Sequence, residues 1–228
     1  MTRGAGITNE VQLASRFASL SKGRRMTAAW LLGRLGRRRA VPLLLRAIEI
    51  DPDAGVRGQA AASVAALGGR VALRGLLRIG KRPDVCGTVL RDVAYALSFI
   101  FDLGALDFLT AAFCNHQMDA ELRAQCAEGI ANLLEGTDRR TRMWRNAVVV
   151  LLPGLEDDDP EVRFWSAFAL GTLRAKVALP ALRTLARVDA RTMSRMGWEI
   201  GEEAKDAICC ILTGQWPEQD ACTRRERS

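Results

Sequence analysis

The chain has 228 residues, of which 49% are hydrophobic, 26% charged and 6% aromatic. This apolar content is enough for a packed core, so it excludes a wholly disordered chain. The single histidine excludes metal sites and catalytic centres that are built from paired histidines. No apolar run reaches the roughly 20 residues of a membrane helix, and the first residues lack the apolar segment of a secretory signal. We therefore expect a cytoplasmic protein.

The net charge of +7 is unevenly distributed along the sequence. The first 116 residues hold 17 Lys and Arg against 8 Asp and Glu, whereas the remainder holds 16 against 18. Nearly all the basic residues are arginine, which suits bidentate contact with carboxylates or phosphates. A codon bias in a GC-rich genome would produce the same excess of arginine, so both explanations stay open. The six cysteines include no C-x-x-C pair, which is typical of free thiols in a reducing compartment.

The first predicted element is a helix over residues 11–20, with Asn9 at its start. A pattern of one arginine followed by small residues four and eight positions later then recurs through the chain. Its arginines are spaced by 32 to 40 residues and are Arg25, Arg57, Arg91, Arg123 and Arg163. The unit at Arg91 fits more loosely, because Tyr95 and Phe99 stand where the other units have small residues. A second apolar segment follows each arginine, and it begins at Ala40, Ala72, Ala105, Ala147 and Ala178. The fourth of these segments comes later than the others, which indicates an insertion around Gly136–Arg145.

Within each unit the apolar residues recur with a helical period, so each unit is predicted to be helix A, a turn and helix B. Asp51-Pro52, Asp119 and Asp159-Pro160 mark helix starts, while Gly36, Gly68 and Gly104 mark the turns. Such a pair buries only one face alone, so neighbouring pairs must stack. The prediction is an all-α fold, an α-solenoid of stacked antiparallel helix pairs. It forms one domain over 1–228, with a cap (1–23), about five repeats (24–189), a second cap (190–216) and a tail (217–228).

One unit runs from Asp158 through Gly171 to Pro180, and it resembles a HEAT repeat of the short bacterial kind found in phycobilin-lyase-like proteins. Residues 24–80 and 119–134 resemble the same pattern, and residues 82–115 resemble it least. The resemblance implies mainly protein binding and scaffolding, although a few members of such families are enzymes or bind nucleic acid. It also implies that Arg57, Arg123 and Arg163 bond to acidic residues of neighbouring loops, and that helix B lines the concave face of the solenoid.

Two surfaces are candidate binding sites. The first is a basic concave groove on helix B that would hold an acidic partner protein, and its residues are Arg46, Arg74, Arg78, Lys81, Arg183 and Arg187. The second is an arginine-rich edge along the turns, which would bind an acidic partner or nucleic acid. Its residues are Arg37, Arg38, Arg39, Arg70, Arg139, Arg140, Arg142, Trp144 and Arg145. Trp144 could stack on a nucleobase or anchor a protein, but packing of the lengthened turn onto the solenoid is the favoured interpretation.

The sequence favours a non-catalytic adaptor without a cofactor or metal ion. Nucleic-acid binding through the turn edge is the alternative, and an accessory subunit or chaperone like the phycobilin-lyase-like proteins is a third. The acidic run 156–159 is interpreted as helix capping rather than cation binding, since no EF-hand spacing accompanies it. His116 is too isolated to form a nucleophile–base pair with Cys114, and Cys209-Cys210 is expected in the core.

Overall fold

The structure, a computed structural model, describes residues 21–192, 194–195 and 197–217. These residues form helices joined by turns, with no β-strand among them, so the predicted all-α fold is confirmed. The chain divides into two compact units, residues 1–108 and 109–228, and each is described by itself. The helix predicted over 11–20 and nearly all of the tail predicted over 217–228 lie outside the described residues. A single domain over the whole chain stays a prediction.

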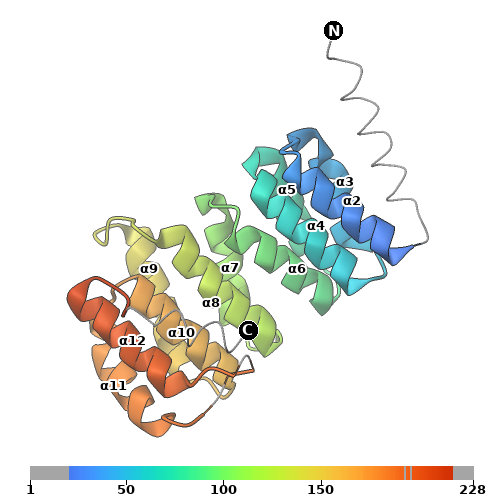
Figure 1. The fold of residues 1–228 in the computed structure, drawn as a ribbon. Helices are drawn as coiled ribbons and strands as arrows, with labels where there is room; N and C mark the ends of the chain where they lie inside the picture. Colours follow the sequence, from blue (N-terminus) through green and yellow to red (C-terminus); the bar gives the residue numbers. More distant parts are fainter. Residues whose placement is uncertain (1–20, 193, 196, 218–228) are drawn as a thin grey trace. The chain divides into compact units, whose positions relative to one another are not determined.

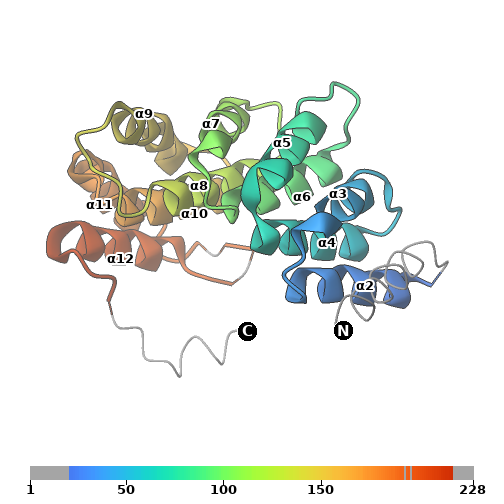
Figure 2. The same cartoon turned by 90° about the horizontal axis from the view of Figure 1, so that it is seen from above.

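The first unit has two layers of helices (Figures 1 and 2). Helices α2 (Lys22–Arg34), α4 (Ala54–Leu67) and α6 (Gly87–Ser98) lie side by side in one layer. Helices α3 (Val41–Ile50) and α5 (Gly69–Gly80) form the other layer, so α2–α3 and α4–α5 are the predicted pairs of helix A and helix B. The core lies between the layers and includes the buried side chains of Leu32, Leu44, Ile48, Val64, Leu76 and Leu97.

Small residues let neighbouring helices of this unit approach closely, as the repeated Ala and Gly positions predicted. A Cβ atom on Gly33 of α2 would lie only 2.6 Å from the Ser63 hydroxyl of α4. That hydroxyl donates a hydrogen bond of 2.9 Å to the Ala29 carbonyl. In the second layer, a Cβ atom on Gly75 of α5 would lie 2.2 Å from Leu45 of α3. Larger side chains at either glycine would therefore push the stacked helices apart.

Helix α7 (Leu106–Cys114) crosses the boundary between the units. In the second unit, α8 (Ala120–Leu134), α10 (Pro160–Thr172) and α12 (Ile200–Thr213) lie side by side (Figure 1). Their partners are α9 (Arg142–Leu151), the 3-10 turn η3 (Leu152–Glu156) and α11 (Leu179–Val188). A Cβ atom on Gly171 of α10 would lie 2.9 Å from the Cα atom of Ala207 in α12. The last helix thus continues the stack through the same kind of small-residue contact.

Aspartates cap the first helices of the repeats, with one difference from the prediction. The carboxylates of Asp119 and Asp159 accept hydrogen bonds of 2.8 Å from backbone amides in the first turns of α8 and α10. At α4 the cap is Asp53, which accepts from the Val56 amide at 3.1 Å, and not the predicted Asp51. Asp51 instead follows the last residue of α3, where its carboxylate is available to an arginine of the preceding helix.

Candidate functional site

In the first unit, two arginines of the repeat pattern form hydrogen bonds between repeats. Arg25 of α2 donates two hydrogen bonds to the Asp51 carboxylate, from Nε to Oδ2 at 2.7 Å and from Nη2 to Oδ1 at 3.0 Å. Arg57 of α4 reaches α6, where its Nε lies 3.1 Å from Asp92 and its Nη2 lies 3.2 Å from the Thr88 hydroxyl. These side chains link successive repeats and are not offered to a ligand.

The second unit repeats the arrangement. Arg123 of α8 donates through both Nη nitrogens to the Asp157 carboxylate, which lies just before α10. Arg163 of α10 pairs with Asp189 at 2.5 Å and donates to the Asp157 carbonyl at 2.7 Å. We call Arg25, Arg57, Arg123 and Arg163 the arginine ladder. Hydrogen bonds to acidic loop residues confirm the role that the resemblance implied for Arg123 and Arg163, whereas the acidic partner of Arg57, Asp92, lies within helix α6.

The environments of the ladder carboxylates differ in their electrostatics. Burial raises the pKa of Asp157, but hydrogen bonds from Arg123 and the Asp159 amide outweigh it and leave this pKa below its ordinary value. Burial also raises the pKa of Asp92, and there the hydrogen bond from Arg57 does not fully compensate. The surroundings of Asp157 therefore favour the ionised carboxylate more strongly than the surroundings of Asp92 do.

Four basic residues on the helix-B layer of the first unit form a surface that we call the helix-B basic face: Arg46 of α3, Arg74 and Arg78 of α5, and Lys81 just after α5. All four are exposed, and no carboxylate among the described residues pairs with them. Arg74 and Arg78 are one helical turn apart and project from the same side of α5. The packing of Leu45 against Gly75 places α3 directly beside that helix.

The predicted residues Arg183 and Arg187 lie on α11, in the second unit. Both are exposed, and Arg187 donates only to the Arg183 carbonyl, at 3.3 Å. They have the same character as the helix-B basic face, because they are one turn apart on a helix B and have no carboxylate partner among the described residues. Since they belong to the other unit, they form a separate pair of basic residues rather than a demonstrated extension of that face.

The turn edge divides between the two units in the same way. Arg38 and Arg39 lie in a short 3-10 turn before α3, and the Arg38 guanidinium lies next to Gly69 at the start of α5. Arg70 is exposed in the first turn of α5, whereas Arg37 is half-buried. In the second unit the insertion is shorter than predicted, because α9 begins at residue 142. Arg139 and Arg140 therefore lie in the turn, while Arg142, Trp144 and Arg145 lie in the first turn of the helix.

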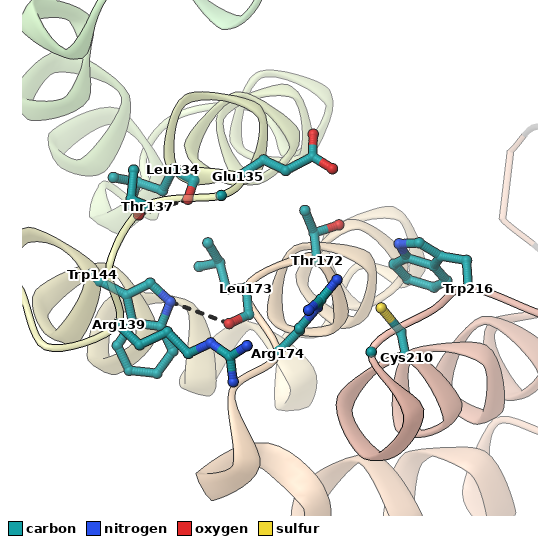
Figure 3. Close-up of a pocket in the computed structure, with 12 residues that line it drawn as sticks. Leu134, Glu135, Thr137, Arg139, Trp144, Thr172, Leu173, Arg174, Cys210 and Trp216 are labelled. Atoms are coloured by element: carbon teal, nitrogen blue, oxygen red, sulfur yellow. Dashed lines mark hydrogen bonds between the residues drawn. The ribbon is translucent and has the colours of Figure 1, made fainter.

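Trp144 ties the inserted turn to the next repeat, which was the favoured interpretation of its role. Its backbone amide donates to the Thr141 hydroxyl at 3.3 Å. Its indole Nε1 donates to the Leu173 carbonyl at 3.2 Å, as Figure 3 shows. The side chain is half-buried. The same tryptophan also forms one side of a cavity, so its ring can contact a ligand as well as pack against the protein.

The cavity has a volume of about 340 Å³ and lies between the turns and helix ends of the second unit. Arginine and tryptophan side chains from three repeats converge on it (Figure 3). Its polar and aromatic lining is Glu135, Thr137, Arg139, Trp144, Thr172, Arg174, Cys210 and Trp216. Arg139 and Trp144 belong to the predicted turn edge. The sequence did not indicate that Trp216 would join them, because it lies 72 to 77 positions further along the chain.

The remaining groups that the sequence singled out are the acidic residues, His116 and the cysteines. Within the described ranges, no group of three or more His, Cys, Asp or Glu side chains could hold a metal ion. His116 is exposed, and Cys210 is buried, which raises the pKa of its thiol. Cys209 is half-buried, and its closest polar neighbour is the Thr213 hydroxyl. Nor is any described helix long and apolar enough to cross a membrane.

Comparison with solved structures finds the same fold in several repeat proteins. The complex of CpcE and CpcF of phycocyanin lyase from Nostoc sp. PCC7120 is 19% identical, with a TM-score of 0.60, and the match covers 77% of this chain and 99% of that one. An archaeal HEAT-like repeats protein from Thermococcus onnurineus is 12% identical, with a TM-score of 0.54 over 88% and 86% of the two chains.

A designed armadillo repeat protein in complex with the peptide (KR)4 is 16% identical, with a TM-score of 0.53 over 88% and 98% of the two chains. No curated protein matches the sequence. At these identities, the structural matches establish the fold alone. The sequence pattern of the family described as HEAT repeats, however, matches residues 12–98 and 106–197, which is more than half of the chain. The chain belongs to the HEAT-repeat family.

Proposed function

We propose that the protein is a non-catalytic scaffold that binds an acidic segment of a partner protein on the helix-B basic face. The observation that carries the proposal is the division of its arginines into two classes. Those of the arginine ladder are paired with buried or half-buried carboxylates. Those of the helix-B basic face are exposed and have no carboxylate partner among the described residues. Arg46, Arg74 and Arg78 can therefore offer their guanidinium groups to another molecule, whereas the ladder arginines cannot.

The geometry of the face supports an extended acidic peptide as the ligand. Arg74 and Arg78 are one turn apart on α5, and each guanidinium group can hold a carboxylate with two hydrogen bonds. Glu49, a carboxylate of α3 in the same layer, already pairs with Arg82, just after α5. The designed armadillo protein of the same fold is in complex with a peptide of Lys and Arg. The present face has the opposite sign of charge from one that would attract such a peptide, so we expect an acidic peptide instead.

Binding of Asp- and Glu-rich peptides, measured by fluorescence anisotropy, tests this proposal. The charge reversal Arg74→Glu with Arg78→Glu should weaken binding at least about tenfold, since two charge-assisted contacts become repulsive. The control Arg24→Glu with Arg34→Glu changes the net charge equally on α2, in the helix-A layer of the same unit. It should bind within about threefold of wild type. If the Arg74→Glu, Arg78→Glu variant (the α5 variant) retains its helicity and binds the peptides as wild type does, the helix-B basic face is not the binding site.

Nucleic-acid binding along the turn edge remains the second candidate, because Arg39 and Arg70 are exposed in the first unit without carboxylate partners among the described residues. It makes a different prediction about salt. Each phosphate contact on a single strand releases a counterion, so the logarithm of affinity should fall linearly with the logarithm of salt concentration, by about 0.7 per contact. A fluorescent oligonucleotide would show this slope, and Arg39→Glu with Arg70→Glu would reduce it. Loss of binding in the α5 variant alone would favour the peptide.

A further inference from the structure

We propose that the cavity of the second unit is a binding site for a small anion with a flat aromatic ring, such as an aromatic carboxylate. The site is separate from the helix-B basic face and does not depend on the function proposed for that face. Its volume of about 340 Å³ is near the lower end of the range for small-molecule pockets, about 300–1,000 Å³. The chemistry of its lining defines the ligand.

Two tryptophans that are already held in place by the protein supply aromatic walls. The indole N–H of Trp144 is engaged with the Leu173 carbonyl, so its ring offers a π-surface and an apolar edge rather than a donor. Trp216 stacks on Phe168 with a centroid distance of 5.4 Å and an interplanar angle of 18°. Its ring also lies over Gly171, where a Cβ atom would approach it to 2.8 Å. Both rings are therefore positioned before any ligand arrives, which reduces the entropic cost of binding.

Two arginines give the cavity a positive charge. Neither Arg139 nor Arg174 forms an ion pair with a described carboxylate, and Glu135 is the single acidic residue in the lining. In Figure 3 both guanidinium groups lie between the two tryptophan rings. A guanidinium group can hold a planar carboxylate with two parallel hydrogen bonds. The lining therefore combines an anion-binding pair with aromatic surfaces.

Arg174 has an unusual backbone conformation at the edge of the cavity. Its φ angle is +52°, in the left-handed region that favours glycine, and Gly214 lies beside its guanidinium, where a Cβ atom would approach Nη1 to 3.4 Å. This left-handed residue ends α10, where the Ala175 amide donates to the Leu170 carbonyl, and the Arg174 side chain contributes to the cavity lining. Thr172 also contributes to the lining, and its hydroxyl oxygen is buried without a hydrogen-bond partner among the described residues.

The first test uses 2-naphthoate and indole-3-acetate as probes, with 2-naphthamide as the uncharged analogue, on the full chain. We expect both acids to bind in calorimetry and the amide to bind at least tenfold more weakly. In NMR spectra the indole N–H signals of Trp144 and Trp216 should shift, while that of Trp30, in the other unit, should not. Equal affinity of acid and amide, no binding of either acid at millimolar concentration, or a shift of Trp30 alone would overturn the proposal.

Variants then test the two arginines. Arg174→Gly removes the guanidinium and suits the positive φ angle, so we expect a folded protein with at least tenfold weaker binding of 2-naphthoate. Arg139→Gln, at an exposed turn position, should weaken binding in the same direction. The matched control is Arg140→Gln, which removes the neighbouring exposed arginine that does not line the cavity. Equal affinities for the Arg139 and Arg140 variants, together with full binding by Arg174→Gly, would refute the assignment.

Discussion

Replacing Asp157 by alanine should destabilise the second unit by about 3–5 kcal/mol, the usual cost of removing one partner from a buried ion pair. The Asp157 and Arg123 side chains are 6% and 9% exposed. The carboxylate accepts hydrogen bonds from both Nη nitrogens of Arg123 and from the Asp159 amide at 3.0 Å. Without it, a buried guanidinium loses its charged partner, while its Nε already lacks a hydrogen-bond partner. The loss of stability therefore comes mainly from the buried Arg123 guanidinium, which no longer has a charged partner.

Urea unfolding followed by tryptophan fluorescence measures this loss, since Trp144, Trp165, Trp198 and Trp216 all lie in the second unit. The control is Glu202→Gln, which breaks an ion pair with Lys205 whose side chains are more than half exposed. It should cost less than about 1 kcal/mol.

Adding Arg123→Met to Asp157→Ala should restore part of the stability, because no buried charge then remains unpaired. If Asp157→Ala costs no more than the Glu202 control, or if the second substitution makes the loss larger, the reasoning about the ladder is refuted.

The same pair predicts a dependence of stability on pH. Because the pKa of Asp157 is lowered in the folded protein, its contribution is fully present above the unfolded pKa of about 4. It is lost as the pH falls through the lower, folded value. The difference in unfolding free energy between wild type and Asp157→Asn should therefore shrink below about pH 4. At Asp92 burial raises the pKa, so Asp92→Asn should cost less at pH 7 than Asp157→Asn. The opposite order would contradict this account.

Three further predictions concern packing, thiol reactivity and the inserted turn. Gly201→Ala should cost about 1–3 kcal/mol in urea unfolding, since its Cβ atom would lie 2.6 Å from a backbone Cα atom. Gly58→Ala, in mid-helix with 3.8 Å of space, should instead stabilise by about 0.5–1 kcal/mol. A hydrogen bond with a threonine hydroxyl and others from backbone amides lower the pKa of the exposed Cys86 thiol, whereas burial raises that of Cys126. Disulfide-exchange reagents should therefore label Cys86 early and Cys126 only on unfolding, and Cys86→Ser should remove a fast phase. Trp144→Phe should cost about 1 kcal/mol in urea by removing one hydrogen bond, and an unchanged midpoint would contradict the anchoring role.

Much of the local structure follows from the sequence alone. The apolar period of each repeat determines which face of a helix is buried, because a helix brings residues three and four positions apart onto one side. The caps Asp119 and Asp159 were predictable for the same local reason, since an aspartate side chain reaches only the amides of the next turn. The cap of α4 was misassigned by two residues, because both Asp51 and Asp53 could serve there and local reasoning does not count the distant Arg25.

Only the tertiary structure decided which arginines are available. Arg57 and Arg74 are the same residue type on neighbouring helices, yet one reaches across to α6 and the other remains exposed. The difference depends on carboxylates about 34 residues away, a separation that is set by the stacking of repeats and not by local preference. The cavity is of the same kind: Trp144, Arg174 and Trp216 meet there because successive turns align at one end of the second unit. Sequence therefore determines the repeat, and the stacking of repeats determines the surfaces.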